Sequence, residues 1–596
     1  ELALITFLPM ILSWIWILAI AALLQIEFNF VNIVISTFIF GLGDDFAIFI
    51  TDGFTSKFSQ GKDIIGTYKK GILLSATTTI IGTGALLFAV HPALNSVALI
   101  SVIGMIAILI ISFTVQPWLL RKMMIDRKKK GLPPVSLVNL IFYIYCWVFF
   151  LSGCLTLFPL QLLFRIIPFG QKRLKLVYHH MMRIFAWMQM YFMINTRKKV
   201  IDRHNLDFSK PSMIIVNHQS AIDVVMIMSL HPKMVIMTND WVYNSPFFGA
   251  QIKYLGFFPG SNGVDKNLEL VRPWVEDGYS VVIFPEGTRS KDKNIKRFHK
   301  GAFYIAEKLN LDISPVMLHG FNDSMKKGDM MLLNGKMSVI ALPRIKAEDT
   351  SWGTTYKGRQ KSISKHFKAE FKKFDLANAG SYYLQHKILS NYIYRSPLIE
   401  WYVKIKWLFE KKNFDHYHDI IPTEGNVYDL GCGYGYLSYF LYFRSEDRRL
   451  IGMDYDKDKI NIANNCYSKN EHVNFMAGDI RELPIEDASA IFLNDVMHYL
   501  PAEDHEPMLE KCLKNLSPDG TLLIRDGVTD LDGRHKKTEQ TEKYSTQIIG
   551  FNKTVNQLCF FSKSFILDFA EKNNLSCEVI EQSQKTSNIL FVLKRK

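Results

Sequence analysis

The chain has 596 residues, 48% of them hydrophobic, and its 70 Lys and Arg against 56 Asp and Glu give a formal charge of +14. Such a length predicts roughly three or four domains. Apolar residues are concentrated in the first third with basic residues beside them, so the charge favours anionic phospholipid as a partner and no nucleic acid. The seven cysteines contain no C-x-x-C pair, which argues against a zinc site or disulfide framework, and no metal is expected.

Four segments of the first third are long enough to cross a membrane as helices. Residues 2–26, 72–90 and 94–120 carry no charge, and residues 30–53 are apolar around Asp44 and Asp45. Carboxylates inside a membrane are costly and usually functional, so this pair is a candidate proton relay. Basic loops at 57–70 and 121–130 predict that these loops and all soluble parts are cytoplasmic. We therefore expect a multi-pass protein of a bacterial inner membrane.

The pattern GLGDDFAIFITDGF, followed by KKGILLSATTTIIGTGALLFAVHPALNSVALISVIGM, resembles the last four helices of RND/MMPL-type exporters over residues 1 to about 125. In that resemblance Asp45 takes the place of an intramembrane proton-carrying Asp, although Phe46 stands where Tyr is usual. The alternative is an acid paired with a Lys or Arg on a missing helix. The resemblance implies an N-terminal transporter half that is missing here, so we expect a piece of a longer protein.

A fifth apolar stretch covers residues 135–169 and is interrupted by Gly153, Pro159 and Pro168. Basic clusters flank it on both sides, which disfavours a simple crossing. The pattern predicts a re-entrant or interfacial helix pair that leaves the following domain on the cytoplasmic face.

From about residue 170, short apolar runs alternate with amphipathic stretches, which predicts an α/β domain. His218 directly follows one such run, and Asp223 comes five residues later, where a helix should begin. Histidine is suited to accept a proton near neutral pH, and a carboxylate can fix its tautomer. We predict His218 as a general base oriented by Asp223, although this spacing alone also fits a histidine that caps a helix.

A second block, FPEGTRS at 284–290, supplies candidate acceptor-binding residues Glu286, Gly287, Thr288 and Arg289. Glycine permits a tight turn, and a guanidinium matches a phosphate. With NHQSAID at 217–223, this block resembles the PlsC family of glycerolipid acyltransferases over about residues 200–345. The resemblance implies an acyl-CoA or acyl carrier protein thioester as donor and a lysophospholipid-like, or other hydroxyl or amine, acceptor. The segment GFFPGSNG at 256–263 lacks an Arg that is usual in the family, which leaves a glycerol-phosphate acceptor open.

A second α/β signature begins near residue 421, with a glycine-rich turn between a strand and a helix. The G-x-G-x-G turn alone could serve NAD or a phosphate. Together with the residues that follow, it resembles the class I S-adenosylmethionine-dependent methyltransferases over about residues 400–596. The resemblance implies S-adenosyl-L-methionine as cofactor, bound by Asp429, Gly431, Gly433, Gly435, Asp454, Asp479, Ile480 and Asn494. His498 is a candidate base for methyl transfer, and a histidine that only packs is the alternative.

We therefore predict a multidomain protein. A transmembrane bundle of four spans at 1–130 is followed by a membrane-associated helix or hairpin at 131–170, a PlsC-like α/β acyltransferase at 171–375, a linker and helical cap at 376–420, and a Rossmann-like methyltransferase at 421–596. The expected function is membrane-bound acyl transfer in phospholipid metabolism, fused to methyl transfer. Such fusions resemble those of Bacteroidetes. The alternative is a lipid or aryl-polyene exporter whose soluble domains tailor the cargo.

Overall fold

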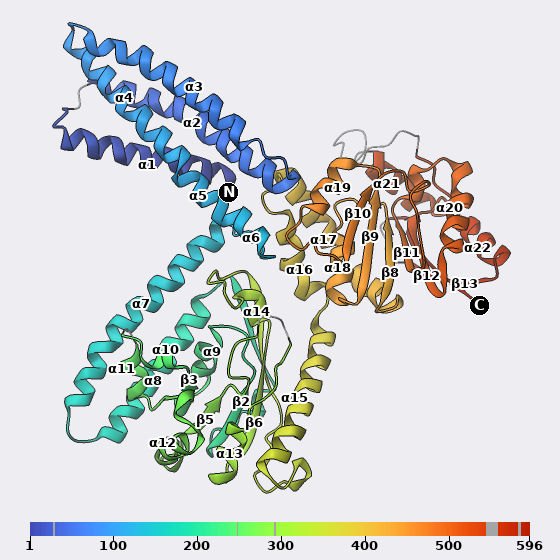
Figure 1. The fold of residues 1–596 in the computed structure, drawn as a ribbon. Coiled ribbons are helices and arrows are strands. Elements are labelled where there is room, and N and C mark those ends of the chain that lie inside the picture. The colour runs from blue at the N-terminus through green and yellow to red at the C-terminus, as the bar shows by residue number, and fades with distance from the viewer. Residues whose placement is uncertain (28–29, 247, 291–293, 544–557, 582–585) are drawn as a thin grey trace. The chain divides into compact units, whose positions relative to one another are not determined.

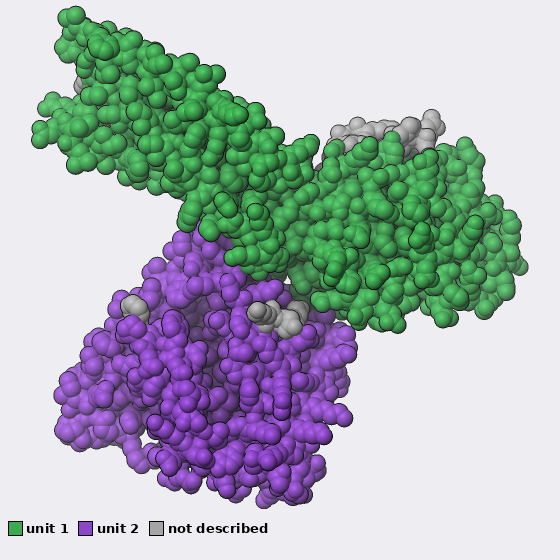
Figure 2. Space-filling view, in the orientation of Figure 1, with its two compact units in different colours: residues 1–134, 380–596 green, residues 135–379 purple. Residues whose placement is uncertain are grey.

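The computed structural model describes residues 1–596 except 28–29, 247, 291–293, 544–557 and 582–585 (Figure 1). The chain forms two compact units (Figure 2). One contains residues 1–134 and 380–596, and the other contains residues 135–379.

The N-terminal helices follow the four predicted spans and lie side by side (Figure 1). They are α1 (Leu2–Leu23), α2 (Phe30–Gln60), α3 (Ile65–Gly84, extended by a 3-10 turn at Ala85–Phe88), α4 (Pro92–Phe113), α5 (Val115–Leu120) and, after a π-helical turn, α6 (Asp126–Lys129). Asp44 lies half-buried and Asp45 exposed within α2. By length and composition, four helical segments among the described residues could cross a membrane: Leu2–Leu23, Ile65–Phe88, Pro92–Lys129 and Leu137–Ile166.

The helix pair predicted within residues 135–169 is wrong, because this stretch is one continuous helix, α7 (Leu137–Ile166). Gly153 is a packing position and does not break the helix. A Cβ added there would lie 2.0 Å from the Phe185 ring of α8 (Gln171–Phe192). Pro159 removes one intrahelical hydrogen bond, which the helix tolerates. Gln251 Nε2, nearly fully buried, also donates to the Cys154 carbonyl at 2.9 Å, so the following domain is attached to α7.

The domain after α8 is built on a seven-stranded sheet in the order β1-β7-β6-β2-β5-β3-β4. Only β6 and β7 pair antiparallel among these neighbours. The strands are β1 (Thr196–Ile201), β2 (Ser212–Val216), β3 (Met234–Thr238), β4 (Phe258–Pro259), β5 (Ser280–Ile283), β6 (Asp312–His319) and β7 (Gly335–Ala341). The helices are α9 (Asp223–Leu230), α10 (Asp240–Tyr243), α11 (Gly249–Tyr254), α12 (Val264–Glu276), α13 (Gly301–Lys308), α14 (Phe321–Ser324) and α15 (Tyr356–Asn378).

The central strand β2 is buried along its whole length, as its sequence SMIIV requires. Ile215 lies opposite Ile283 of β5 and Pro315 of β6 in parallel register. Parallel strands covered on both faces are expected to be continuously apolar. This register brings the residues that follow β2 and β5 to the same edge of the sheet.

The C-terminal domain has a second seven-stranded sheet in the order β10-β9-β8-β11-β12-β14-β13, parallel except for β14, which runs antiparallel to both neighbours. The strands are β8 (Gly425–Leu430), β9 (Arg448–Asp454), β10 (Val473–Ala477), β11 (Ala488–Asn494), β12 (Leu516–Gly527), β13 (Leu575–Ile580) and β14 (Asn588–Arg595). The helices are α16 (Ser381–Leu389), α17 (Pro397–Ile420), α18 (Tyr436–Arg444), α19 (Lys457–Asn464), α20 (Ala502–Lys514), α21 (Asp532–Lys543) and α22 (Lys563–Lys572). The strand order reverses between β8 and β11, where ligands bind in open α/β sheets.

Candidate active sites

His218 and Asp223 meet at the carboxyl end of β2. His218 Nδ1 lies 2.9 Å from Asp223 Oδ2, the carboxylate is fully buried, and the imidazole side chain is 19% exposed. The same oxygen accepts the backbone N–H groups of Gln219 at 2.6 Å and Ser220 at 2.8 Å. These bonds hold the carboxylate against the ring, so Nδ1 carries the proton and Nε2 is the nitrogen left to accept one.

Glu286 joins the two sequence blocks at this edge. Its Oε1 accepts the backbone N–H of His218 at 2.8 Å, and its Oε2 accepts the Ser290 hydroxyl at 3.0 Å and the Lys296 N–H at 2.7 Å. The Ser290 N–H in turn donates to the His218 carbonyl at 2.9 Å. Glu286 is only 4% exposed. The structure therefore gives it a place in positioning His218, whereas the sequence suggested contact with the acceptor.

The other three residues of the second block lie toward solvent. Gly287 has φ +67°, which favours glycine, and both it and Thr288 are exposed. Arg289 is half-buried, and its carbonyl accepts from Lys296 Nζ at 3.3 Å and Lys327 Nζ at 3.0 Å. Lys327 also donates to the Thr288 hydroxyl at 2.9 Å.

Lys327 is a site residue that the motifs did not reveal. It comes from the loop between α14 and β7, about forty residues after the second block, and brings an ammonium group to that loop. The GFFPGSNG segment instead supplies edge strand β4 and a short 3-10 turn. Positive charge beside Arg289 is therefore contributed by Lys327 and Lys296.

The glycine-rich turn of the second site connects β8 with α18. Gly431, Gly433 and Gly435 all have positive φ, at +79°, +54° and +77°. A Cβ on Gly435 would lie 2.5 Å from the Phe475 ring, so that glycine is needed for packing. A Cβ on Gly433 would meet nothing within 4 Å. This open backbone borders a cavity of about 200 Å³ and fits the close approach of a cofactor.

Acidic side chains surround this turn. Asp454, at the end of β9, accepts the Gly433 N–H at 2.8 Å through Oδ2 and the Asp456 N–H at 2.8 Å through Oδ1. Its oxygens retain lone pairs for ribose hydroxyls. Asp429, near the end of β8 before the turn, accepts the Ser438 hydroxyl at 2.6 Å. Burial raises the pKa of Asp429 to about 6.

The remaining predicted cofactor residues line the same cavity. Asp479 and Ile480 follow β10, and Asn494 ends β11. Asp479 forms an ion pair with Arg481, which lowers the pKa of the carboxyl. The cavity also has walls that the motifs did not indicate, from α17, α18, α21 and the segment after β11. These are Tyr402, Lys406, Tyr436, Asp495, Tyr499, Leu500 and Glu542.

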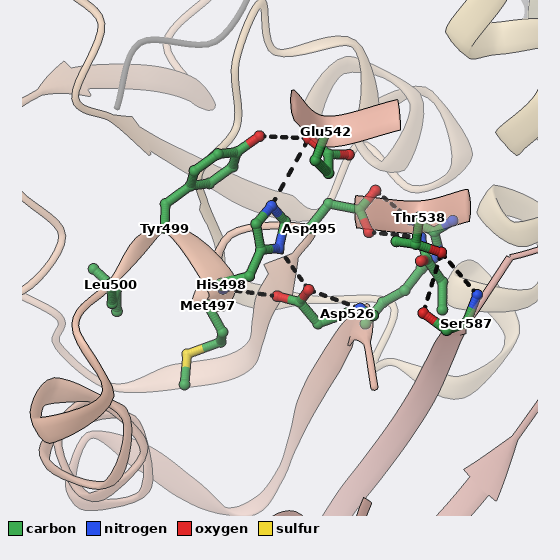
Figure 3. Close-up of polar contacts among 12 residues, drawn as sticks. Asp495, Met497, His498, Tyr499, Leu500, Asp526, Thr538, Glu542 and Ser587 are labelled. Carbon is green, nitrogen blue, oxygen red and sulfur yellow. Dashed lines mark hydrogen bonds and ion pairs between the residues drawn. The ribbon is translucent and has the colours of Figure 1, made fainter. Parts of the chain in front are cut away.

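His498 lies between two carboxylates and is 2% exposed (Figure 3). Its Nδ1 is 2.6 Å from Asp526 Oδ1, and its Nε2 is 3.8 Å from Glu542 Oε2, which also accepts the Tyr499 hydroxyl at 2.7 Å. Burial disfavours the imidazolium, but Asp526 and Glu542 outweigh it and raise the pKa of His498 to about 10. A histidine that is charged at neutral pH cannot accept a proton there, so this arrangement favours a positioning role.

Two parts of the chain match family models. Residues 197–319 match the Acyltransferase family, and residues 427–520 match a methyltransferase domain family. The chain carries an acyltransferase domain and a methyltransferase domain. Both predicted enzyme classes are thus confirmed, whereas the exporter resemblance of residues 1–125 stays a prediction.

Relatives match each domain separately. Over 169 residues the chain is 30% identical to a chloroplastic 1-acyl-sn-glycerol-3-phosphate acyltransferase of Brassica napus, covering 27% of this chain and 48% of that protein. Over 111 residues it is 33% identical to a carboxy-S-adenosyl-L-methionine synthase of Actinobacillus succinogenes, covering 18% of this chain and 46% of that protein. The chain thus spans about half the length of these curated relatives. The crystal structure of PlsC from Thermotoga maritima aligns with 17% identity and a TM-score of 0.36, over 40% of this chain and 97% of that one.

Proposed function

We propose that this protein is a membrane-bound enzyme with two transferase activities. The acyltransferase moves an acyl chain from a CoA or acyl carrier protein thioester to the hydroxyl of a lysophospholipid-like acceptor. The methyltransferase uses S-adenosyl-L-methionine. The observation that carries the first activity is the 2.9 Å contact between His218 Nδ1 and the buried Asp223, which leaves Nε2 as a proton acceptor.

The acyl transfer step follows from this geometry. The acceptor hydroxyl attacks the thioester carbonyl carbon while His218 Nε2 takes its proton. The tetrahedral intermediate then collapses, an ester bond forms, and the C–S bond breaks to release a thiolate. The proton on His218 is available to that thiolate. Asp223 stabilises the imidazolium between the two steps.

A phosphate on the acceptor is supported by the charges beside this dyad. Arg289 offers a planar fork, and Lys327 and Lys296 place ammonium groups at its carbonyl. The plant relative is named for acylation of a glycerol 3-phosphate ester. We therefore favour lysophosphatidic acid as the acceptor class, although GFFPGSNG lacks the usual Arg.

Membrane attachment is supported by the helices. In the part of the chain that the structure describes, four segments are long and apolar enough to cross a bilayer, and one of them, α7, packs on α8 of the acyltransferase domain. Basic residues at 121–130 favour the cytoplasmic face of a bacterial inner membrane. There the soluble domains would meet cytoplasmic thioesters and S-adenosyl-L-methionine.

The methyltransferase cavity fits this cofactor by its open Gly433 backbone and by the Asp454 carboxylate. When bound, the cofactor supplies an electrophilic methyl group. The chain's own part is to hold it and to align an acceptor. His498 pairs with Glu542 at the cavity wall, and Glu542 in turn accepts the Tyr499 hydroxyl.

The proposal is tested with the full chain in detergent, supplied with oleoyl-CoA and radiolabelled lysophosphatidic acid. We expect labelled phosphatidic acid and one free thiol per ester formed. Monoacylglycerol, which lacks the phosphate, should react at least tenfold more slowly. Equal rates with both acceptors would contradict the acceptor assignment, and no ester from either, with CoA or carrier-protein donors, would contradict the acyl transfer.

A further inference from the structure

The methyltransferase cavity contains cations at both of its ends. Lys406, Lys459 and Arg481 are the Lys and Arg side chains among the described residues that line it. Their positions follow from the strand order β10-β9-β8-β11, because Arg481 comes after β10 and Lys459 after β9. Lys406 comes from α17, and its Nζ lies 4.0 Å from Asp495 Oδ2, beside the end of β11. Three strand spacings, roughly 14 Å, separate β10 from β11.

A nucleoside bound here has its orientation fixed by Asp454. Its carboxylate is at the end of β9, held by the Gly433 and Asp456 N–H groups, and it is the acceptor suited to a ribose diol. With a ribose at Asp454, Asp479 and Ile480 after β10 would hold the base. The Gly431 and Gly433 backbone and the end of β11 would then hold the other end of the ligand.

The β11 end of the cavity is suited to an amino acid. Asp429 and Asn494 offer oxygens to an ammonium group, whereas Asp495 is already paired with Arg525. Lys406 offers an ammonium to a carboxylate. Arg481 follows edge strand β10 and pairs with Asp479 and Asp504, so it lies at the opposite end of the cavity. Lys459 is 8% exposed and follows β9, beside Asp454.

Helix α17 holds Lys406 in place. Lys406 Nζ lies 3.1 Å from Glu410 Oε1 one helical turn later, and the Lys406 side chain is 31% exposed. Glu410 is in turn within 3.4 Å of the Tyr436 hydroxyl. The lysine therefore has a fixed position on the cavity wall and an exposed part that a ligand can reach.

We propose that Lys406 binds the carboxylate of the amino-acid end of S-adenosyl-L-methionine, so that α17 is part of the cofactor site. This rests on the proposed methyltransferase function. Helix α17 thereby selects a cofactor with an intact methionyl group over one without its carboxylate. The competing explanation is that Lys406 only neutralises Glu410 and Asp495.

Calorimetry on the full chain in detergent separates these explanations. The ligands are S-adenosyl-L-methionine and decarboxylated S-adenosyl-L-methionine, which differ by the carboxylate. For Lys406→Met we expect the Kd of the first to rise at least tenfold and that of the second to change less than twofold, because a hydrogen bond to a charged group is lost only with the first. Lys406→Arg should restore most of the affinity. Lys404→Met is the matched control, since Lys404 is on the same helix, pairs with Glu400 and is 57% exposed.

Equal weakening of both ligands in Lys406→Met, or no change in either, would overturn the inference and leave the methyltransferase function standing. A wild-type chain that binds neither ligand would overturn the proposed function itself, and this inference with it. Folding is checked separately by the calorimetric Tm, so equal weakening of both ligands is counted against the inference in a variant with the wild-type Tm. Lys406→Gln replaces Lys406→Met if the latter has a lowered Tm.

Discussion

Replacing Glu286 by Gln separates two roles for this residue. The carboxylate accepts from three donors, the His218 N–H, the Ser290 hydroxyl and the Lys296 N–H, at 2.8, 3.0 and 2.7 Å. A glutamine has one oxygen and one NH2 group. Whichever way it turns, its NH2 faces a backbone N–H, so one buried donor loses its partner.

An unpaired buried donor costs about 1–3 kcal/mol. If that cost falls on the placement of His218, the rate falls about 10- to 100-fold, since each ~1.4 kcal/mol is a factor of ten. We expect kcat to fall by this amount with the KM for lysophosphatidic acid unchanged. Thiol release from oleoyl-CoA measures both constants.

Glu276→Gln is the matched control, because Glu276 is exposed at the end of α12. It should leave both constants as they are. A raised KM with an unchanged kcat in Glu286→Gln would exclude the positioning role and assign Glu286 to acceptor contact.

Lys327→Met should raise the KM for lysophosphatidic acid about tenfold and leave that for monoacylglycerol unchanged; equal effects would exclude a phosphate contact. Gly433→Ala should weaken S-adenosyl-L-methionine binding at least tenfold with a loss of stability of about 1 kcal/mol. Gly435→Ala, whose Cβ would strike Phe475, should mainly lower the Tm. Weaker binding in Gly435→Ala and a lower Tm in Gly433→Ala would place the cofactor elsewhere. The pKa of His498 is raised in the folded state to about 10, so its stabilisation is complete below pH 6.5 and lost as the pH rises through 10. The Tm of the calorimetric transition that S-adenosyl-L-methionine shifts should fall over this pH range, and its slope against pH should be flatter in His498→Gln. Equal slopes would contradict the ion pairs of His498 with Asp526 and Glu542.

The local features of this chain were predictable from sequence. The dyad could be anticipated because His218 and Asp223 lie at the two ends of one short strand-to-helix turn. The glycine-rich turn carried its own signal, since its positive φ angles require glycine. Apolar runs of sufficient length likewise indicated the N-terminal helices.

Contacts between distant segments were not predictable. Nothing in the sequence ties Glu286 to the His218 backbone, 68 residues away, or Lys327 to the second block. The sequence predicts a helix break at Gly153, because it does not show that the Phe185 ring packs against this position. His498 looked like a candidate base, because Asp526 and Glu542 lie far from it in the chain.

His218 is the proposed general base of acyl transfer. The most direct measurement compares ester formation from oleoyl-CoA and lysophosphatidic acid by the wild-type chain, His218→Ala and Asp223→Asn. We predict that both variants lose at least about a hundredfold in kcat. Binding of S-adenosyl-L-methionine should be unchanged in both, which reports an intact fold of the other domain. Activity of His218→Ala within a few-fold of the wild type would show that His218 is not the general base.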